Sequence, residues 1–133
     1  MKGKASGSCL CGNVQFEFAL PTKWCSHCHC SLCRRAHGAG FVTWVGVDAK
    51  GFSIKTGETQ LHRYRSSHEA FRSFCSSCGS TLFFESQKWP GEVHVVLANI
   101  ATPIDREPES HAHPDDRVGW IPDWDIAPRP KVH

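Results

Sequence analysis

The chain has 133 residues, 40% hydrophobic and 21% charged, a composition that favours one folded domain over a disordered chain. Its 15 basic and 13 acidic residues give a formal charge of +2, which gives little support to general nucleic-acid binding. No apolar run is long enough for a membrane helix, and the polar start from Met1 to Gly12 lacks the apolar stretch of a secretory signal. We therefore expect a cytoplasmic protein with neither a membrane nor a nucleic-acid partner.

Taken in chain order, most segments are predicted to be short strands separated by turn residues. Val14, Phe16 and Phe18 alternate with polar residues, which indicates a strand with one buried face. A short helix is expected over residues 31–37, with Ser31 as its N-cap and Gly38 as its end. Further strands are expected over residues 41–47, 52–55, 61–65, 71–74, 81–85 and 92–99.

The segment 102–133 carries six of the eight prolines. We expect it to be extended and packed on the domain, with Trp120 and Trp124 as its contacts. The sequence shows no internal repeat and no linker long enough to separate domains, so residues 1–133 are interpreted as one mainly β domain.

Seven of the eight cysteines fall into three tight clusters, Cys9-x-Cys11, Cys28-x-Cys30-x-x-Cys33 and Cys75-x-x-Cys78. In a reducing compartment such clusters bind metal or carry out redox chemistry more often than they form disulfides. Four thiolates close a tetrahedral zinc site, whereas three leave one position open. A closed site holds a fold together, and an open one can bind a substrate.

The first and last clusters together supply four ligands. Cys75-Ser-Ser-Cys78-Gly79 is typical of a zinc knuckle, and Cys9-x-Cys11-Gly12 would provide the other two thiolates. One shared zinc would pin the N-terminal strand to a distant hairpin and contribute roughly 10–16 kcal/mol to folding. The alternative is two unrelated pairs of reduced cysteines.

The run Cys28-His29-Cys30-Ser31-Leu32-Cys33 offers three thiolates and an open position for water or an incoming thiol. Arg34 follows directly and could bind a substrate carboxylate, although Arg34 and Arg35 could equally form a solvated basic helix face. Cys25 could instead close this site as a fourth ligand, or be a small apolar residue beside Trp24. His27 and His29 are further candidate ligands or neighbours.

Together the motifs resemble the glutathione-dependent formaldehyde-activating enzyme family, which includes centromere protein V-like domains. The resemblance implies a tent of coiled antiparallel sheets and two zinc ions. Cys9, Cys11, Cys75 and Cys78 would hold a structural zinc, and Cys28, Cys30 and Cys33 a catalytic one. The implied activity is that of a carbon–sulfur lyase, forming S-hydroxymethylglutathione from glutathione and formaldehyde. The segments that carry the resemblance are residues 7–14, 28–34 and 74–81, with His111 and Trp120 further on.

Arg34 and His29 are the candidate substrate contacts. One departure is Ala98-Asn99-Ile100-Ala101, where the family usually has a Gly-x-Leu-Asp-like segment.

Three other hypotheses remain open from the sequence. One is a structural zinc module that binds protein or nucleic acid without catalysis. Another is a redox enzyme similar to methionine sulfoxide reductase, with Cys25 as its free thiol. The third is an iron–sulfur cluster on Cys25 and the three-cysteine run.

Overall fold

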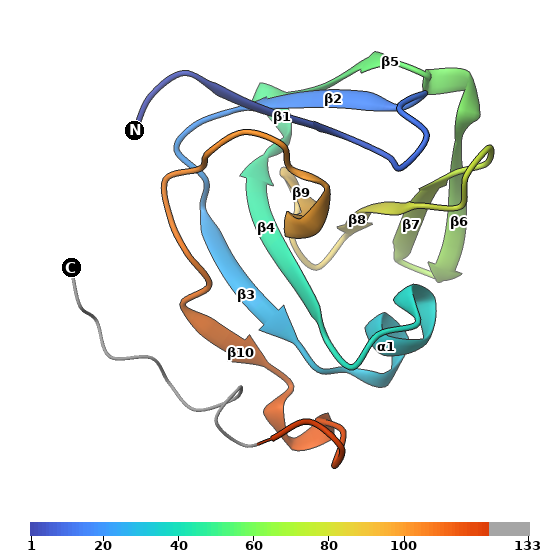
Figure 1. Ribbon diagram of the computed structural model, residues 1–133, viewed down its shortest axis with the longest axis vertical. Coiled ribbons are helices and arrows are strands. Elements are labelled where there is room, and N and C mark those ends of the chain that lie inside the picture. The colour runs from blue at the N-terminus through green and yellow to red at the C-terminus, as the bar shows by residue number, and fades with distance from the viewer. Residues whose placement is uncertain (123–133) are drawn as a thin grey trace.

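The computed structural model describes residues 1–122, in which ten strands and one α-helix are found (Figure 1). The strands are β1 (Lys4–Ser8), β2 (Gln15–Ala19), β3 (Trp24–Cys28), β4 (Val42–Asp48), β5 (Phe52–Thr56), β6 (Leu61–Ser67), β7 (Ala70–Cys75), β8 (Thr81–Ser86), β9 (Glu92–Val96) and β10 (Ser110–Ala112). The helix is α1 (Ser31–His37), and short 3-10 turns lie at Ala49–Gly51, Glu58–Gln60, Leu97–Asn99 and Pro114–Asp116. Within this described part, no helix has both the length and the apolar character that a membrane crossing requires.

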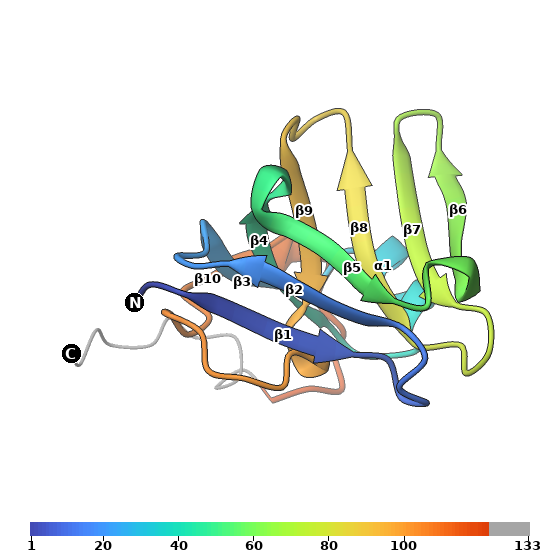
Figure 2. The same ribbon diagram turned by 90° about the horizontal axis from the view of Figure 1, so that it is seen from above.

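The strands form two sheets. The smaller sheet has the order β1-β2-β5, and the larger has the order β10-β3-β4-β9-β8-β7-β6. Seen from above, the strands of the small sheet run across β6, β7, β8 and β9 of the large one (Figure 2). All pairings between these strands are antiparallel except that of β10 with β3, which is parallel.

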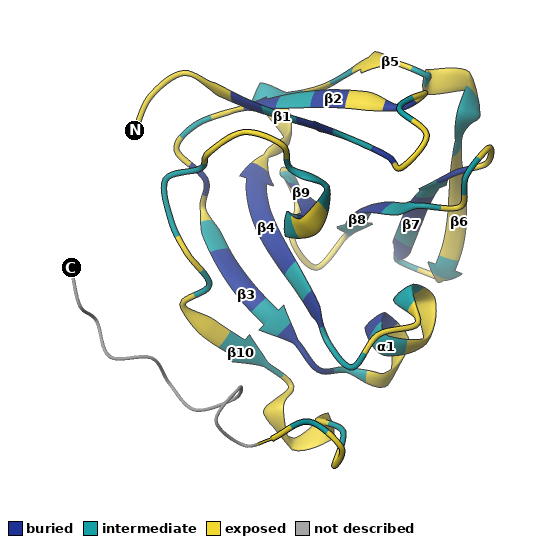
Figure 3. Ribbon diagram, viewed as in Figure 1, coloured by how far each residue is buried: buried dark blue, intermediate teal, exposed yellow. Residues whose placement is uncertain are grey.

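The main core lies between the two sheets, and long stretches of β3 and β4 are coloured as buried in Figure 3. Phe16 and Phe18 alternate inward from β2, and Phe16 meets Phe83 of β8 edge to face with 5.0 Å between ring centroids. Val45 of β4 and Val95 of β9 belong to the same cluster. Burial of these large apolar side chains is the main favourable term that joins the sheets.

A second, smaller cluster lies on the opposite side of the large sheet, under α1. It contains Cys28, Cys33, Val42, Trp44 and Val96. Because successive side chains of a strand point to opposite faces, β4 sends Val45 to the main core and Trp44 to this second cluster. Two of the predicted metal ligands are therefore part of a packed apolar cluster.

The expected fold class is confirmed: the described chain is mainly β, with one short helix and two sheets. Three strands were not predicted, namely β1, β3 and β10. The β1 sequence is small and polar, β3 carries cysteine and histidine in place of an apolar alternation, and β10 has three residues. The larger sheet also differs from the expected small antiparallel sheets, because β10 adds a parallel edge.

Two element boundaries differ from the sequence expectation. The N-cap of α1 is Cys30, whose sulfur accepts a hydrogen bond from the backbone N–H of Cys33, and the helix ends at Gly38 in the left-handed conformation as expected. The late strand ends at Val96, because Leu97–Asn99 forms a 3-10 turn. Trp120 is 72% exposed and lies against Gly40, whereas Trp124 lies outside the described residues.

Candidate metal centres and active site

The four-cysteine group joins two turns that belong to different sheets. Cys9 and Cys11 lie in the turn between β1 and β2, while Cys75 ends β7 and Cys78 follows in the turn to β8. The backbone N–H of Leu10 donates to the Ser80 hydroxyl over 2.8 Å and links the two turns directly. Each turn continues into a glycine with φ of +81°, Gly12 or Gly79, a conformation that a side chain disfavours.

The sulfur positions in this group suit a tetrahedral ion. All four sulfurs lie within 4.8 Å of one another, with 3.6 Å between Cys9 and Cys11 and 3.8 Å between Cys11 and Cys75. Sulfurs at about 2.3 Å from a tetrahedral zinc would lie about 3.8 Å apart. A hydrogen bond from Ser80 lowers the pKa of Cys78 to about 5, whereas burial and the other three sulfurs raise the pKa of Cys11 to about 11.

The three-cysteine group is assembled by β3 and the first turn of α1. Cys28 ends β3, Cys30 caps α1 and Cys33 lies in its first turn, and all three sulfurs lie within 4.8 Å of one another. The backbone of His29 donates to the Ala112 carbonyl of β10 over 2.9 Å, which fixes the loop between Cys28 and Cys30. The three thiols therefore converge at one place that could hold an ion.

Cys25 does not join this group. It is fully buried in the main core, on the face of β3 opposite to Cys28. Burial raises the pKa of the Cys25 thiol to about 11. The structure thus contradicts a fourth ligand at Cys25, a cluster on four cysteines and a reactive thiol at this position.

The neighbouring histidines have other partners. His27 Nδ1 shares a hydrogen bond of 2.7 Å with the Thr43 hydroxyl. His29 is 1% exposed, and its Nε2 shares a hydrogen bond of 2.9 Å with His111 Nδ1. Neither ring belongs to the group of ligand atoms formed by Cys28, Cys30 and Cys33. The buried ring of His29 is therefore paired with His111 and is not placed among the three sulfurs.

Arg34 and Arg35 occupy different environments. Arg34 is partly buried, and its Nε donates to the His29 carbonyl over 3.2 Å, so its side chain is held beside the cysteine loop. Arg35 is exposed. Of the two arginines, only Arg34 is tied by its side chain to the segment that carries the cysteines.

Two charged or titratable residues near the cysteines were not predicted from the sequence. The guanidinium of Arg72, on β7, donates from Nη2 to Cys33 Sγ over 3.5 Å. His37, at the end of α1, packs edge to face on Trp44, and burial lowers its pKa to about 4. Arg72 lies two residues after Ala70 on β7 and therefore on the same face of the strand, which could have indicated that Arg72 is buried. An arginine in a strand ordinarily indicates the solvent side, however, so the sequence pattern did not identify it.

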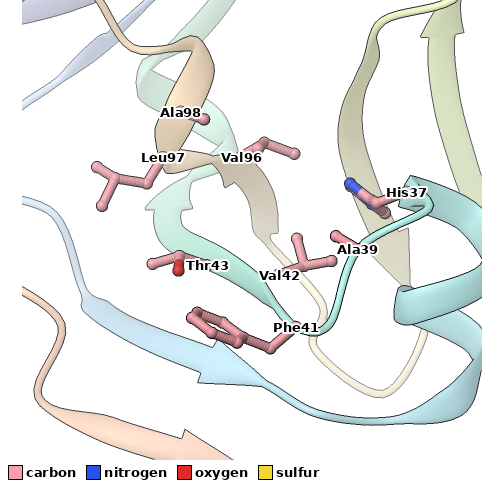
Figure 4. Close-up of a pocket in the computed structure, with 8 residues that line it drawn as sticks. All are labelled: His37, Ala39, Phe41, Val42, Thr43, Val96, Leu97 and Ala98. Carbon is pink, nitrogen blue, oxygen red and sulfur yellow. The ribbon is translucent and has the colours of Figure 1, made fainter. Parts of the chain in front are cut away.

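A pocket of about 410 Å³ lies next to this cluster (Figure 4). Val42 and Val96 form part of its wall and also pack with Cys28 and Cys33. His37 extends toward it from the end of α1, and Phe41 and Leu97 lie around its other side (Figure 4). Its lining is mainly apolar and includes none of the clustered cysteines of the described chain, so the pocket adjoins the thiols through a layer of side chains.

Comparison with known proteins gives a consistent family. Residues 4–116 match the model of the family described as glutathione-dependent formaldehyde-activating enzyme. A protein of Halomonas elongata, whose name provisionally calls it a glutathione-dependent formaldehyde-activating enzyme, is 30% identical over 123 residues, 86% of this chain and 78% of the relative. An uncharacterized lyase of Schizosaccharomyces pombe is 32% identical over 78 residues, covering 59% of this chain and 55% of the relative.

The fold is also found among solved structures. A crystal structure of a Rhodobacter sphaeroides protein aligns with a TM-score of 0.63 and 25% identity, over 75% of this chain and 90% of that one. The family model spans nearly all of the described residues, including both cysteine groups. The chain belongs to the glutathione-dependent formaldehyde-activating enzyme family.

Proposed function

We propose that this protein is a zinc-dependent carbon–sulfur lyase-type enzyme that joins a glutathione-like thiol to formaldehyde or a related aldehyde. The observation that carries the proposal is the difference between the two cysteine groups, one of four thiols and one of three, in a member of this family. Four thiolates complete a tetrahedral site, whereas three leave a position for an exchangeable ligand.

Each group has a distinct role in this proposal. Cys9, Cys11, Cys75 and Cys78 would hold a structural zinc, and Cys28, Cys30 and Cys33 a catalytic one. At the three-cysteine group, zinc would supply Lewis acidity that lowers the pKa of an incoming thiol. The buried neighbours of Cys28 and Cys33, chiefly Trp44 and Val96, would exclude water from the reacting sulfur.

The reaction forms one carbon–sulfur bond. The thiol sulfur attacks the aldehyde carbon, the π electrons of the carbonyl move to its oxygen, and that oxygen takes up the proton that the thiol loses. The main contribution of the protein would be to hold the two reactants in attacking geometry. Arg34, whose Nε is held by the His29 carbonyl, is proposed to bind a substrate carboxylate. The ring of His29 is buried, so its proposed contribution to substrate binding is to orient His111, with which it shares a hydrogen bond.

The decisive test compares wild-type protein with Cys30→Ser. Serine is a good N-cap residue, so this variant should keep α1 while losing one thiolate. Metal content is measured by elemental mass spectrometry, and S-hydroxymethylglutathione formation is measured by NMR exchange between glutathione and ¹³C-formaldehyde. We expect two zinc ions and a rate above the uncatalysed background in wild type, but one zinc ion and the background rate in Cys30→Ser.

Two outcomes would contradict the proposal. Wild-type protein loaded with two zinc ions that gives only the background rate would indicate a structural zinc module. A wild-type protein that holds a single zinc ion after reconstitution would remove the catalytic centre altogether.

The role of Arg34 is tested separately by Arg34→Gln, with the exposed Arg35→Gln as its matched control. Loss of a charged hydrogen bond to a carboxylate weakens binding by roughly 1.5–3 kcal/mol, so KM for glutathione should rise about tenfold or more while zinc content stays at two. Equal KM values for the two variants would show that Arg34 does not contact the substrate.

A further inference from the structure

Arg72 is a buried cation without a carboxylate partner. It lies on β7 and is 8% exposed, and it forms no ion pair with a carboxylate in residues 1–122. Arginine remains charged at all ordinary pH values. A buried charge is strongly unfavourable unless a nearby group of opposite charge compensates for it.

The contacts of Arg72 point to its compensating charge. Nη2 donates to Cys33 Sγ over 3.5 Å, and the guanidinium carbon lies 4.8 Å from the centroid of the Phe84 ring. Nη1 is buried and has no hydrogen-bond partner among the described residues. The ring of Phe84 attracts the guanidinium but carries no net charge, so the candidate counter-charge is the three-cysteine group.

The net charge of that group, once it holds an ion, explains why a buried cation would lie beside it. A divalent ion with three thiolates carries a net charge of −1, and an incoming substrate thiolate would make it −2. Such charge is hard to accommodate beside the apolar side chains of Trp44 and Phe84. One buried guanidinium in contact with Cys33 would return the loaded centre to −1.

We propose that Arg72 is the charge partner of the three-cysteine centre. It is a positioning residue: it holds the Cys33 thiolate by hydrogen bonding and makes an anionic fourth ligand acceptable. This inference rests on the proposed metal at Cys28, Cys30 and Cys33, but not on the identity of the aldehyde or thiol. Arg34 lies on the helix, so the two arginines would have different tasks, one at the ion and one at a carboxylate.

The first experiment measures zinc affinity by competition with a chromophoric chelator in wild type, Arg72→Met and Arg72→Lys. The matched control is Arg63→Met, since Arg63 is also an arginine over a phenylalanine ring but its side chain is 50% exposed. Loss of a group that hydrogen-bonds a metal ligand typically weakens binding 10–100-fold. In Arg72→Met we expect one of the two zinc ions to be weakened by this factor and the other to stay unchanged, with partial recovery in Arg72→Lys.

The outcomes separate this inference from the proposed function. If wild type binds two zinc ions and folded Arg72→Met binds both with wild-type affinity, the role of Arg72 is overturned while the proposed catalytic centre stands. Equal weakening of both ions would also overturn it, because the effect would then be on the whole fold. A wild type that binds one zinc ion would overturn both.

A second measurement covers the case in which Arg72→Met unfolds. Unfolding of the protein is compared in Cys33→Ala, Arg72→Met and the double variant. If the two residues compensate for each other, the double variant should change the unfolding equilibrium constant at least tenfold less than the product of the two single-variant changes. Single effects that simply multiply in the double variant would overturn the pairing.

Discussion

At the scale of single residues, burial and strand parity separate cysteines that look equivalent in the sequence. Cys25 and Cys28 are three positions apart on β3, an odd spacing that puts them on opposite faces. Cys25 therefore packs with Val45 in the main core, while Cys28 reaches the cluster under α1. Chemical roles follow from this separation, because only a thiol that faces other thiols can share an ion with them.

Replacement of Cys25 tests this separation. Cys25→Ala should lower the free energy of unfolding by about 1–2 kcal/mol through a small core cavity and leave two zinc ions bound. Cys28→Ala, the matched change on the other face, should remove one zinc ion. Elemental analysis and denaturant unfolding measure both effects, and loss of zinc from Cys25→Ala would show that the core thiol is a ligand after all.

His37 provides a pH-dependent prediction at the same scale. Burial lowers its pKa to about 4 from the ordinary 6.5, so between these values the unfolded chain binds a proton that the folded protein does not. Stability should therefore fall as pH drops from about 6.5 to about 4, by roughly 2 kcal/mol once the partial exposure of His37 is considered.

The measurement is the difference in unfolding free energy between wild type and His37→Gln at a series of pH values. This difference isolates His37 from the protonation of the cysteine ligands, which both proteins share. The exposed His68→Gln serves as the control variant. A wild-type minus His37→Gln difference that does not vary between pH 6.5 and pH 4 would contradict the prediction.

At the scale of elements, β1 lies very close to the turn after β9. Gly7 forms an isolated bridge with Ile100. A Cβ on Gly7 would lie 2.1 Å from the Asn99 carbonyl oxygen and 2.6 Å from the Phe16 ring. Both neighbours belong to packed parts of the structure, so they have little room to move.

The change Gly7→Ala should accordingly destabilise the protein by about 2–4 kcal/mol. Gly119→Ala is the control, since a Cβ there meets nothing within 4 Å, and it should be close to neutral. Thermal unfolding of the two zinc-loaded variants gives the comparison. Similar midpoints for both would mean that β1 can move away from Asn99 at little cost.

At the scale of the whole molecule, the two cysteine groups differ in what they connect. The four-cysteine group joins the turn after β1 to the turn after β7, and thus one sheet to the other. The three-cysteine group links neighbouring segments, β3 and α1, on the far side of the large sheet. Loss of the first should therefore affect the entire fold, and loss of the second mainly its own neighbourhood.

This contrast predicts unequal effects of two serine substitutions. Cys75→Ser should lower the free energy of unfolding by several kcal/mol, enough to leave much of the protein unfolded at 25 °C. Cys30→Ser should cost less than about 2 kcal/mol, because serine can still cap α1. Circular dichroism and denaturant titration distinguish the two, and equal unfolding would mean that both groups are structural.

Features that depend on short-range spacing could be predicted before the fold was known. The Cys-x-x-Cys-Gly turn, the cysteine run that leads into α1 and the alternation of Phe16 and Phe18 could all be interpreted locally, because ligand spacing and strand period are properties of neighbouring residues. The order of these motifs also indicated the family. The mainly β class followed from the same patterns, although strands without apolar alternation, such as β3, escaped them.

Contacts between distant parts of the chain became visible only in the folded protein. Arg72 contacts Cys33 across 39 positions, and His29 meets His111 across 82. Cys25 was excluded from the ligands by the face of β3 on which it lies. Such contacts depend on sheet order, register and the packing of two sheets, which no local pattern specifies. The charge around the three-cysteine group, and with it the chemistry that the group can support, is therefore set by the fold rather than by the motif.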